Sequence, residues 1–431
     1  MRRDELERPR EMQPAGALRA LHRELHRAPH RAVQLTRVRP AAQERRATRR
    51  GAVRPPVFDS REWGFAMSYI TGLGIATAAF PDIASLLDVD FAARATLAPA
   101  AKPGDYVRAN LPFPLVQRMA REDRSLLNPS SRLALQVAAE ALDAASAGRP
   151  YTSEERERFA VFTGVEGEDA TMAVLTPLHA RHGLDACGYL GEVKADLNPL
   201  DMLRLLTTNA LYQISKLFAL RGEGYPLQRM SLTSLCALEE AHRQIEGGAI
   251  ERAVIAAVGD MTSADNVAAF EKMGLLRTSS HPVGIVPAFG AVAAVVERTP
   301  RGGGRPCAQV LDVHSLYKPD TSVSSADWSR LFARFPDQGA LGVPHVVLYQ
   351  NGEPSLAKAE RNAVLHAWPN AVMHAYKPYV GYTGRANNLI DLVLAIADPA
   401  IPIGAAVLVN GIGVSSGLGA ILVRKLSGVG R

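Results

Sequence analysis

Ser231 is the residue whose type and position best suit chemistry, because it stands at a sharp turn between a strand and a helix. The stretch 225–260 reads as a short strand, this turn, a helix over 233–246, a glycine stop and an apolar strand over 253–258. A side chain in the first turn of a helix lies at the positive end of the helix dipole, where a nucleophile or an anion is stabilised. Ser231 is therefore a candidate nucleophile, although a serine in this place can also serve only as a helix cap.

The elements that must position this turn indicate an α/β fold. The strand 253–258 is apolar on both faces, so both faces must be covered, as in a layered α/β core. The order of elements also repeats within the chain. The first half gives a strand at 160–164, a helix at 233–246, and strands at 253–258 and 290–297, and the second half repeats this order at 346–352, 386–397, 405–410 and 418–424. Two similar α/β halves that pack together are predicted.

The segment around Ser231 resembles the ketosynthase (β-ketoacyl-acyl carrier protein synthase) family of the thiolase fold. In that family the same strand-turn-helix-strand unit carries a Thr-Ala-Cys-Ser/Ala-Ser motif, whose Cys attacks the acyl thioester. Laying the helix segment 235–241 and the strand that ends at Asp260 on the family pattern puts Ser231 in the place of that Cys. The resemblance implies a thiolase-like fold, in which two duplicated α/β halves form a layered αβαβα core.

Two further ketosynthase motifs match later in the chain. In the family a strand ends in His-Gly-Thr-Gly/Ser-Thr, and the matching segment here is 349–353, which puts Asn351, or Gln350 if the register shifts by one, in the place of the His. The family's Lys-Ser-x-x-Gly-His motif matches the segment that begins at Lys377. The lysine is kept as Lys377, and Tyr382 replaces the second His.

These replacements remove the groups that condensation uses. A Cys at a helix start is activated because its thiolate forms near neutral pH, whereas a Ser hydroxyl needs an adjacent base. The amide of Asn351 donates a hydrogen bond but cannot titrate as an imidazole does. Lys377 is a candidate base only if it is neutral. We expect a protein that no longer condenses and that resembles the chain-length-factor subunits of type II polyketide and aryl-polyene systems.

The resemblance also implies partners. A chain-length-factor-like subunit pairs with an active ketosynthase, here as a heterodimer or with itself as a homodimer, and it meets an acyl carrier protein; the segment 224–230 is the expected pairing edge. Two alternatives stay open. One is an acyltransferase or thioesterase-like enzyme in which Ser231 forms an acyl ester and Tyr382, Asn351 and backbone amides stabilise the oxyanion. The other is a homodimer that only binds acyl chains or the carrier protein. Whether the chain is an enzyme is left open, and no cofactor or metal is implied.

Composition is that of an ordinary soluble globular protein, and the resemblance to ketosynthases implies a place in fatty acid or polyketide biosynthesis. The chain has 431 residues, of which 47% are hydrophobic and 21% charged. Its three cysteines are far apart and form no Cys-x-x-Cys pair, so neither a zinc site nor a disulfide framework is indicated. There is no run of eighteen apolar residues, and a cytoplasmic protein is expected. Cys236 is interpreted as a core residue, and His345 and His374 are candidates for restoring an imidazole near the later motifs.

Charge divides the chain at about residue 66. Residues 1–66 hold sixteen Arg and eight acidic residues, a net charge of +8, whereas the whole chain carries +6. We predict a disordered tail over 1–66, followed by ketosynthase-like halves over 67–300 and 301–431. An arm for nucleic acid or an anionic surface and an Arg-rich transit peptide are alternatives for the tail. The favoured interpretation is that the natural start is Met67, so no nucleic-acid partner is expected.

Overall fold

The computed structural model describes residues 67–97, 107–108, 119–165, 181, 203–204, 206–301, 305–319, 322–335 and 344–429. The chain separates into two units, Met1–Glu62 and Trp63–Arg431, and all described residues belong to the second. The predicted tail therefore lies outside the described residues. Within the described part of the chain, every helix is too short or too polar to cross a membrane.

The described strands form one eleven-stranded sheet in which the first half of the chain and the second half repeat one strand order. The first half contributes β1 (Ser68–Ala76), β3 (Phe159–Val165), β4 (Gly224–Pro226), β5 (Arg252–Asp260) and β6 (Ala288–Glu297), and β2 (Val107–Arg108) pairs with β6. The second half contributes β7 (Ala308–Leu316), β8 (His345–Val347), β9 (Val372–His374), β10 (Ala406–Gly413) and β11 (Gly417–Lys425).

The path through the sheet confirms the predicted duplication. Its order is β4-β3-β5-β6-β1 and then β7-β11-β10-β8-β9, so the two sets meet at β1 and β7 as mirror-ordered copies. The directions repeat too: β3 is parallel to β4 and β5, and β8 is parallel to β9 and β10, whereas β5–β6, β1–β6, β10–β11 and β7–β11 are antiparallel. The two halves of the sheet are joined where Ser68–Ile70 of β1 pairs antiparallel with Ala308–Val310 of β7.

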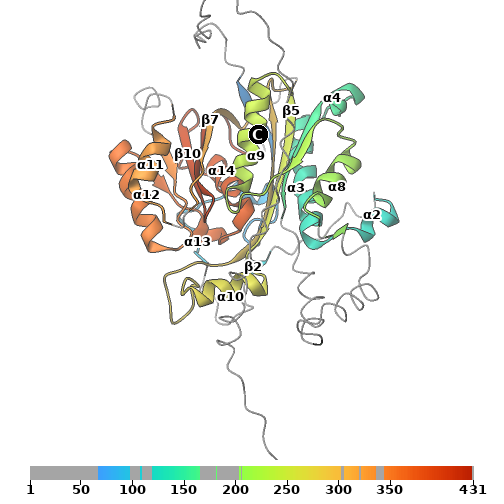
Figure 1. The fold of residues 1–431 in the computed structure, drawn as a ribbon. Helices are drawn as coiled ribbons and strands as arrows, with labels where there is room; N and C mark the ends of the chain where they lie inside the picture. Colours follow the sequence, from blue (N-terminus) through green and yellow to red (C-terminus); the bar gives the residue numbers. More distant parts are fainter. Residues whose placement is uncertain are drawn as a thin grey trace, which may run out of the picture. The chain divides into compact units, whose positions relative to one another are not determined.

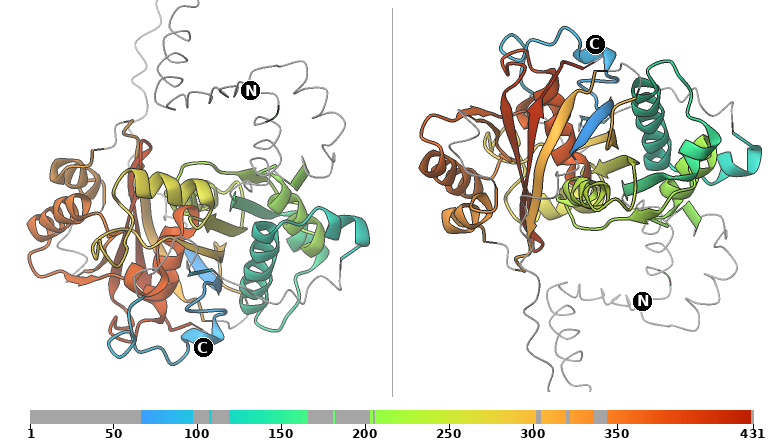
Figure 2. Two further views of the ribbon diagram at one scale, coloured as in Figure 1. Left: turned by 90° about the horizontal axis from the view of Figure 1, so that it is seen from below. Right: turned by 90° about the horizontal axis from the view of Figure 1, so that it is seen from above.

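Helices cover both faces of each half of the sheet. The described helices are α2 (Arg121–Ser125), α3 (Pro129–Ser146), α4 (Ser153–Glu157), α8 (Asn209–Phe218), α9 (Thr233–Glu246), α10 (Ala264–Lys272), α11 (Ser325–Phe332), α12 (Pro354–Ala367), α13 (Lys377–Val380) and α14 (Asn387–Ala397), with the short 3-10 turns η1 (Ala84–Leu86) and η4 (Gly384–Ala386). In Figures 1 and 2, α3 and α8 lie on one flank and α11 and α12 on the opposite flank. The helices α9 and α14 lie between them.

Three apolar clusters correspond to these layers. One holds α9 and α14 between the inner faces of the two halves, a second holds α3 and α8 on the outer face of the first half, and a third holds α11 and α12 on the outer face of the second. The predicted stripe on α9, which includes Leu235, Leu238 and Ile245, is fully buried in the first cluster. This arrangement confirms the expected αβαβα layering.

Two predicted strands are shorter than expected, and both differences lie at the site. The predicted strand over 346–352 keeps its ladder only as far as Val347, because the chain then turns and Gln350 takes a left-handed φ of 26°. The expected edge segment over 224–230 is a strand only over Gly224–Pro226. After β8 the residues that leave the sheet supply side chains of the site, and after β4 the chain leads into the turn that carries Ser231.

Candidate functional site

Ser231 lies in a tight turn that joins β4 to α9. Leu232 N donates to Arg229 O at 3.0 Å and Thr233 N donates to Met230 O at 3.1 Å, while Met230 has a left-handed φ of 49°. The side chain that ties this turn together is Thr233, whose Oγ1 accepts from Arg229 N at 2.9 Å. Among the described residues, no side chain caps the start of α9. The capping role considered for Ser231 is therefore wrong: its hydroxyl points elsewhere.

The Ser231 hydroxyl meets two phenols from the second half of the chain. Its Oγ is hydrogen-bonded to the Tyr382 hydroxyl, and Tyr349 Oη donates to Tyr382 Oη at 3.3 Å. The two phenol rings meet edge to face with centroids 6.3 Å apart. All three residues are buried, Ser231 with 5% of its surface exposed. The structure thus brings all three motif segments together through three hydroxyl groups.

Tyr382 reaches this point because the loop before α14 presses directly on β5. A Cβ on Gly259 would collide with the carbonyl oxygen of Thr383, so this glycine lets the loop approach the strand. Across the helix starts, Leu389 N donates to Ser234 Oγ at 3.4 Å. The starts of α9 and α14 are therefore held face to face, with Ser231 and Tyr382 between them.

Sequence reasoning missed Tyr349. From the segment 349–353 we expected Asn351 or Gln350 in the place of the imidazole. Both line the pocket described below, but Asn351 Oδ1 accepts from Glu353 N at 3.1 Å and Gln350 faces the guanidinium of Arg361. The side chain that reaches Tyr382 is that of Tyr349. A signal was present in the sequence, since aligning Gly352 with the second glycine of His-Gly-Thr-Gly places Tyr349 at the His.

The electrostatics of Tyr349 keep its hydroxyl protonated. Burial raises the pKa of Tyr349 well above its usual value, and the neighbouring Tyr382 hydroxyl raises it further. The backbone N of Tyr349 donates to Glu360 Oε1 at 2.8 Å, and Asn410 Nδ2 donates to the same oxygen at 2.8 Å. Burial likewise raises the pKa of Glu360 to about 7. A neutral phenol donates a hydrogen bond but accepts a proton poorly.

Lys377 lies in the site but is bound in an ion pair. Its Nζ donates to Asp391 Oδ2, and both residues are buried, with exposed fractions of 5% and 1%. The same Nζ lies 5.0 Å from the centre of the Tyr349 ring. Burial raises the pKa of Asp391, an effect that the Lys377 charge opposes. The lysine is thus held between a carboxylate and an aromatic face.

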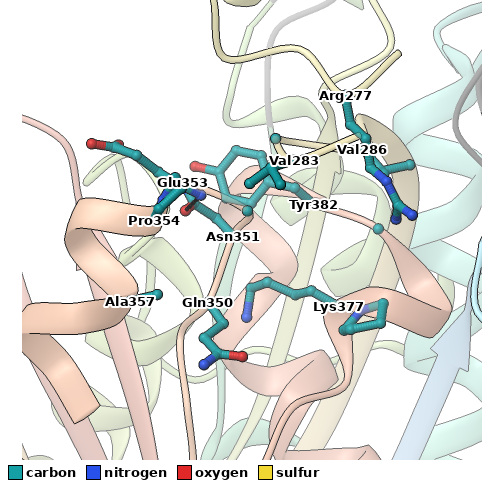
Figure 3. Close-up of a pocket in the computed structure, with 14 residues that line it drawn as sticks. Arg277, Val283, Val286, Gln350, Asn351, Glu353, Pro354, Ala357, Lys377 and Tyr382 are labelled. Atoms are coloured by element: carbon teal, nitrogen blue, oxygen red, sulfur yellow. Dashed lines mark hydrogen bonds between the residues drawn. The ribbon is translucent and has the colours of Figure 1, made fainter. Parts of the chain in front are cut away.

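A pocket of about 290 Å³ opens beside these residues (Figure 3). Asn351, Lys377 and Tyr382, which the sequence predicted for the site, all line it, whereas Ser231 is absent from its wall. The remaining wall residues are Arg277, Val283, Gly284, Val286, Gln350, Gly352, Glu353, Pro354, Ala357, Pro378 and Gly381. The wall mixes apolar side chains with two cations, two amides and one carboxylate. Such a lining suits a ligand with both apolar and hydrogen-bonding parts.

The other residues singled out in the sequence lie apart from this pocket. Cys236 is buried on α9, where burial raises the pKa of its thiol, as expected for a core residue. His345 Nδ1 lies 3.0 Å from His374 Nε2, and neither imidazole lines the pocket. His374 lines a different cavity, of about 250 Å³, together with Asp398. Among the described side chains, no group of three or more His, Cys, Asp or Glu residues could hold a metal ion.

Comparisons with known proteins identify the fold. Residues 108–300 match the family model described as the N-terminal domain of beta-ketoacyl synthase. Among curated proteins, no sequence matches the chain. Among solved structures, the chain is similar to a beta-ketoacyl synthase from Burkholderia phymatum STM815, with a TM-score of 0.69 and 17% identity over 84% of this chain and 99% of that one.

Two other similar structures come from polyketide systems. One is the ishigamide ketosynthase/chain length factor, with a TM-score of 0.67 and 15% identity over 84% of this chain and 99% of that one. The other is a type II polyketide synthase acyl carrier protein in complex with its ketosynthase bound to the hexaketide, with a TM-score of 0.62 and 13% identity over 84% of this chain and 99% of that one. At these identities the likeness establishes the fold.

Proposed function

We propose that the chain is a non-condensing subunit of the ketosynthase family, a proposal supported by its match to the N-terminal domain of beta-ketoacyl synthase over residues 108–300 and by its fold. It pairs with an active ketosynthase in polyketide or fatty acid biosynthesis, as a chain-length-factor-like protein does. One observation carries the proposal: three buried hydroxyls, those of Ser231, Tyr349 and Tyr382, stand together where the family resemblance places a thiol and two imidazoles.

The chemistry of these hydroxyls supports the absence of condensation. Attack on a thioester needs a thiolate, or a Ser hydroxyl next to a base that takes its proton. The groups nearest the Ser231 hydroxyl are the phenols of Tyr382 and Tyr349, and the raised pKa of Tyr349 keeps that phenol neutral. The Lys377 ammonium group is paired with the Asp391 carboxylate. No base among these residues is placed to activate Ser231.

The sheet edge next to the turn supports pairing with another subunit. Among the described strands, β4 pairs on one side only, with β3. Large apolar side chains stand beside this edge in contact with solvent, namely Tyr225 with 45% and Met230 with 54% of their surfaces exposed. An open edge flanked by apolar side chains is favourable for association with a second chain. The proposed partner at this edge is a second ketosynthase-fold subunit. The proposed donor of the acyl group to the pair is an acyl carrier protein.

The proposal is tested by offering an acyl carrier protein thioester to the full chain, alone and co-expressed with a ketosynthase that retains Cys and both His. Intact-protein mass spectrometry should find the acyl group on the partner and none on this chain. Co-purification should give a one-to-one complex. Ser231→Ala should leave both results unchanged, because Ser231 is not a nucleophile in this proposal.

The competing candidate is an acyltransferase or thioesterase-like enzyme, for which the buried Ser231 hydroxyl at the start of a helix is the favouring observation. An acyl adduct on the wild-type chain that disappears in Ser231→Ala would establish that candidate and end the non-condensing proposal. A stable homodimer that refuses the ketosynthase partner, with no adduct, would instead favour an acyl-chain or carrier-protein binding protein.

A further inference from the structure

The Tyr382 side chain stands between the open pocket and the Ser231 hydroxyl. Tyr382 lines the pocket, and its hydroxyl is hydrogen-bonded to Ser231, which does not line the pocket. Only 6% of the Tyr382 surface and 5% of the Ser231 surface are exposed. The phenol therefore forms the wall that separates the two. A ligand in the pocket meets this ring before it can meet Ser231.

The backbone of Tyr382 is fixed in place, so only its side chain can open this wall. Tyr382 N donates to Val286 O at 2.8 Å, and Ala288 N donates to Tyr382 O at 3.0 Å. The preceding residue, Gly381, has a φ of 76°, and a Cβ there would lie 2.6 Å from that of Ala288. The two hydrogen bonds hold the backbone at Tyr382, and the close approach at Gly381 leaves no room for a side chain there.

The ring itself is held by packing as well as by its hydroxyl. Its centroid lies 6.1 Å from that of Phe270 and 6.3 Å from that of Tyr349, in both cases edge to face. Rotation of the ring would break the bonds to Ser231 and Tyr349 and leave three buried hydroxyls to find new partners. A buried hydroxyl that is left without a partner destabilises the arrangement. The closed arrangement is thus favoured by several contacts at once.

We propose that the Tyr382 phenol is a plug that keeps position 231 closed to compounds in the pocket, and that its ring volume, more than its hydroxyl, determines this exclusion. Removing the ring joins the pocket of about 290 Å³ to the Ser231 hydroxyl in one continuous acyl site. The inference rests on the part of the proposed function that places Ser231 at the nucleophile position. In addition to the missing base, the plug keeps ligands in the pocket from reaching the Ser231 hydroxyl.

Access is measured with a cysteine at position 231, because a thiol reports accessibility without a neighbouring base. Ser231→Cys, Ser231→Cys/Tyr382→Phe and Ser231→Cys/Tyr382→Ala are each treated with iodoacetamide, and modification of residue 231 is followed by peptide mass spectrometry. The wild-type chain, treated in the same way, gives the background modification of the natural cysteines Cys187, Cys236 and Cys307. Peptide mapping separates these natural cysteines from position 231.

The expected order of rates follows from ring volume. The thiol introduced at position 231 should react slowly beside Tyr382 and within about threefold of that rate beside Phe, which keeps the ring. Beside Ala it should react at least about tenfold faster, because access no longer requires a local opening of packed side chains. A bulkier maleimide should show a larger difference than iodoacetamide.

Equal rates in all three variants would overturn the plug, as would fast modification of the Ser231→Cys chain alone. A rise with Phe as large as with Ala would show that the hydroxyl, and not the ring, closes the site. Thermal unfolding followed by circular dichroism checks that each variant is folded; if the Ala variant is not, Ser231→Cys/Tyr382→Leu replaces it. Pairing with a ketosynthase and acylation of wild-type Ser231 are separate readouts, so failure of the plug and failure of the proposed function are distinguishable.

Discussion

The turn before α9 and the loop before α14 occupy matching places in the two halves of the sheet, yet they are stabilised in different ways. The turn before α9 holds Ser231 between residues of one short segment, and it includes Met230 in a left-handed conformation. The loop before α14 depends on a buried ion pair, that of Lys377 with Asp391. The two halves therefore share one strand order, but backbone hydrogen bonds hold the turn before α9 and a buried ion pair holds the loop before α14.

The comparison shows how a duplicated fold can change its chemistry while it keeps its scaffold. The close approach at Gly259 and the pairing of β1 with β7 keep the two helix starts together. Within that frame, the side chains that meet are replaceable as long as their buried polar groups are hydrogen-bonded. The hydroxyls of Ser231, Tyr349 and Tyr382 meet this condition by bonding to one another.

The largest predicted effect comes from breaking the buried ion pair of the second half. Lys377→Met leaves the Asp391 carboxylate buried without its cation, which should lower the free energy of unfolding by roughly 3–5 kcal/mol. Urea denaturation at neutral pH measures the change. The double variant Lys377→Met/Asp391→Leu is the matched control and should recover most of the loss. If the double variant is less stable than the single one, the pair does not support the loop in this way.

The next effect depends on pH and concerns Glu360. Its pKa in the folded protein is raised from 4.5 to about 7, so the fold favours the protonated acid. The resulting stabilisation is fully present below about pH 4.5 and is lost as the pH rises through about 7. Glu360→Gln removes this dependence and should unfold at higher urea than wild type at pH 9, by about 3 kcal/mol in the free energy of unfolding, with little difference at pH 4.5.

The control for this pH series is Glu154→Gln, because Glu154 is exposed on α4. It should change the stability by the same small amount at both pH values. A Glu360→Gln variant whose advantage over wild type is constant between pH 4.5 and pH 9 would contradict the protonated state assigned to Glu360.

The smallest predicted effect tests the backbone strain of the first half. Met230 has a φ of 49° and is half exposed, so its side chain contributes little packing. Met230→Gly should be more stable than Met230→Ala by about 1 kcal/mol, because glycine adopts the left-handed region without the Cβ penalty. Thermal unfolding of the two variants gives the difference. Equal stabilities would mean that the turn relaxes and stores no strain.

The sequence by itself determined the elements next to the site and the repeated order of strands. The helix predicted over 233–246 has the same bounds as α9. The helix predicted over 386–397 corresponds to α14, which begins one residue later, at Asn387. The repeat of strands predicted the doubled sheet, and the family motifs located Ser231, Lys377 and Tyr382. These features can be read locally because helical and strand periodicity and glycine stops act over a few neighbouring residues.

Only the tertiary structure decided which side chains meet. Tyr349 rather than Asn351 reaches Tyr382 because the chain leaves β8 at Val347, so strand alternation no longer decides which of the following side chains faces the site. Ser231 bonds to a phenol 151 positions away instead of capping its own helix. Such contacts depend on how separate elements pack, since a hydroxyl pairs with whatever partner the fold brings within about 3 Å.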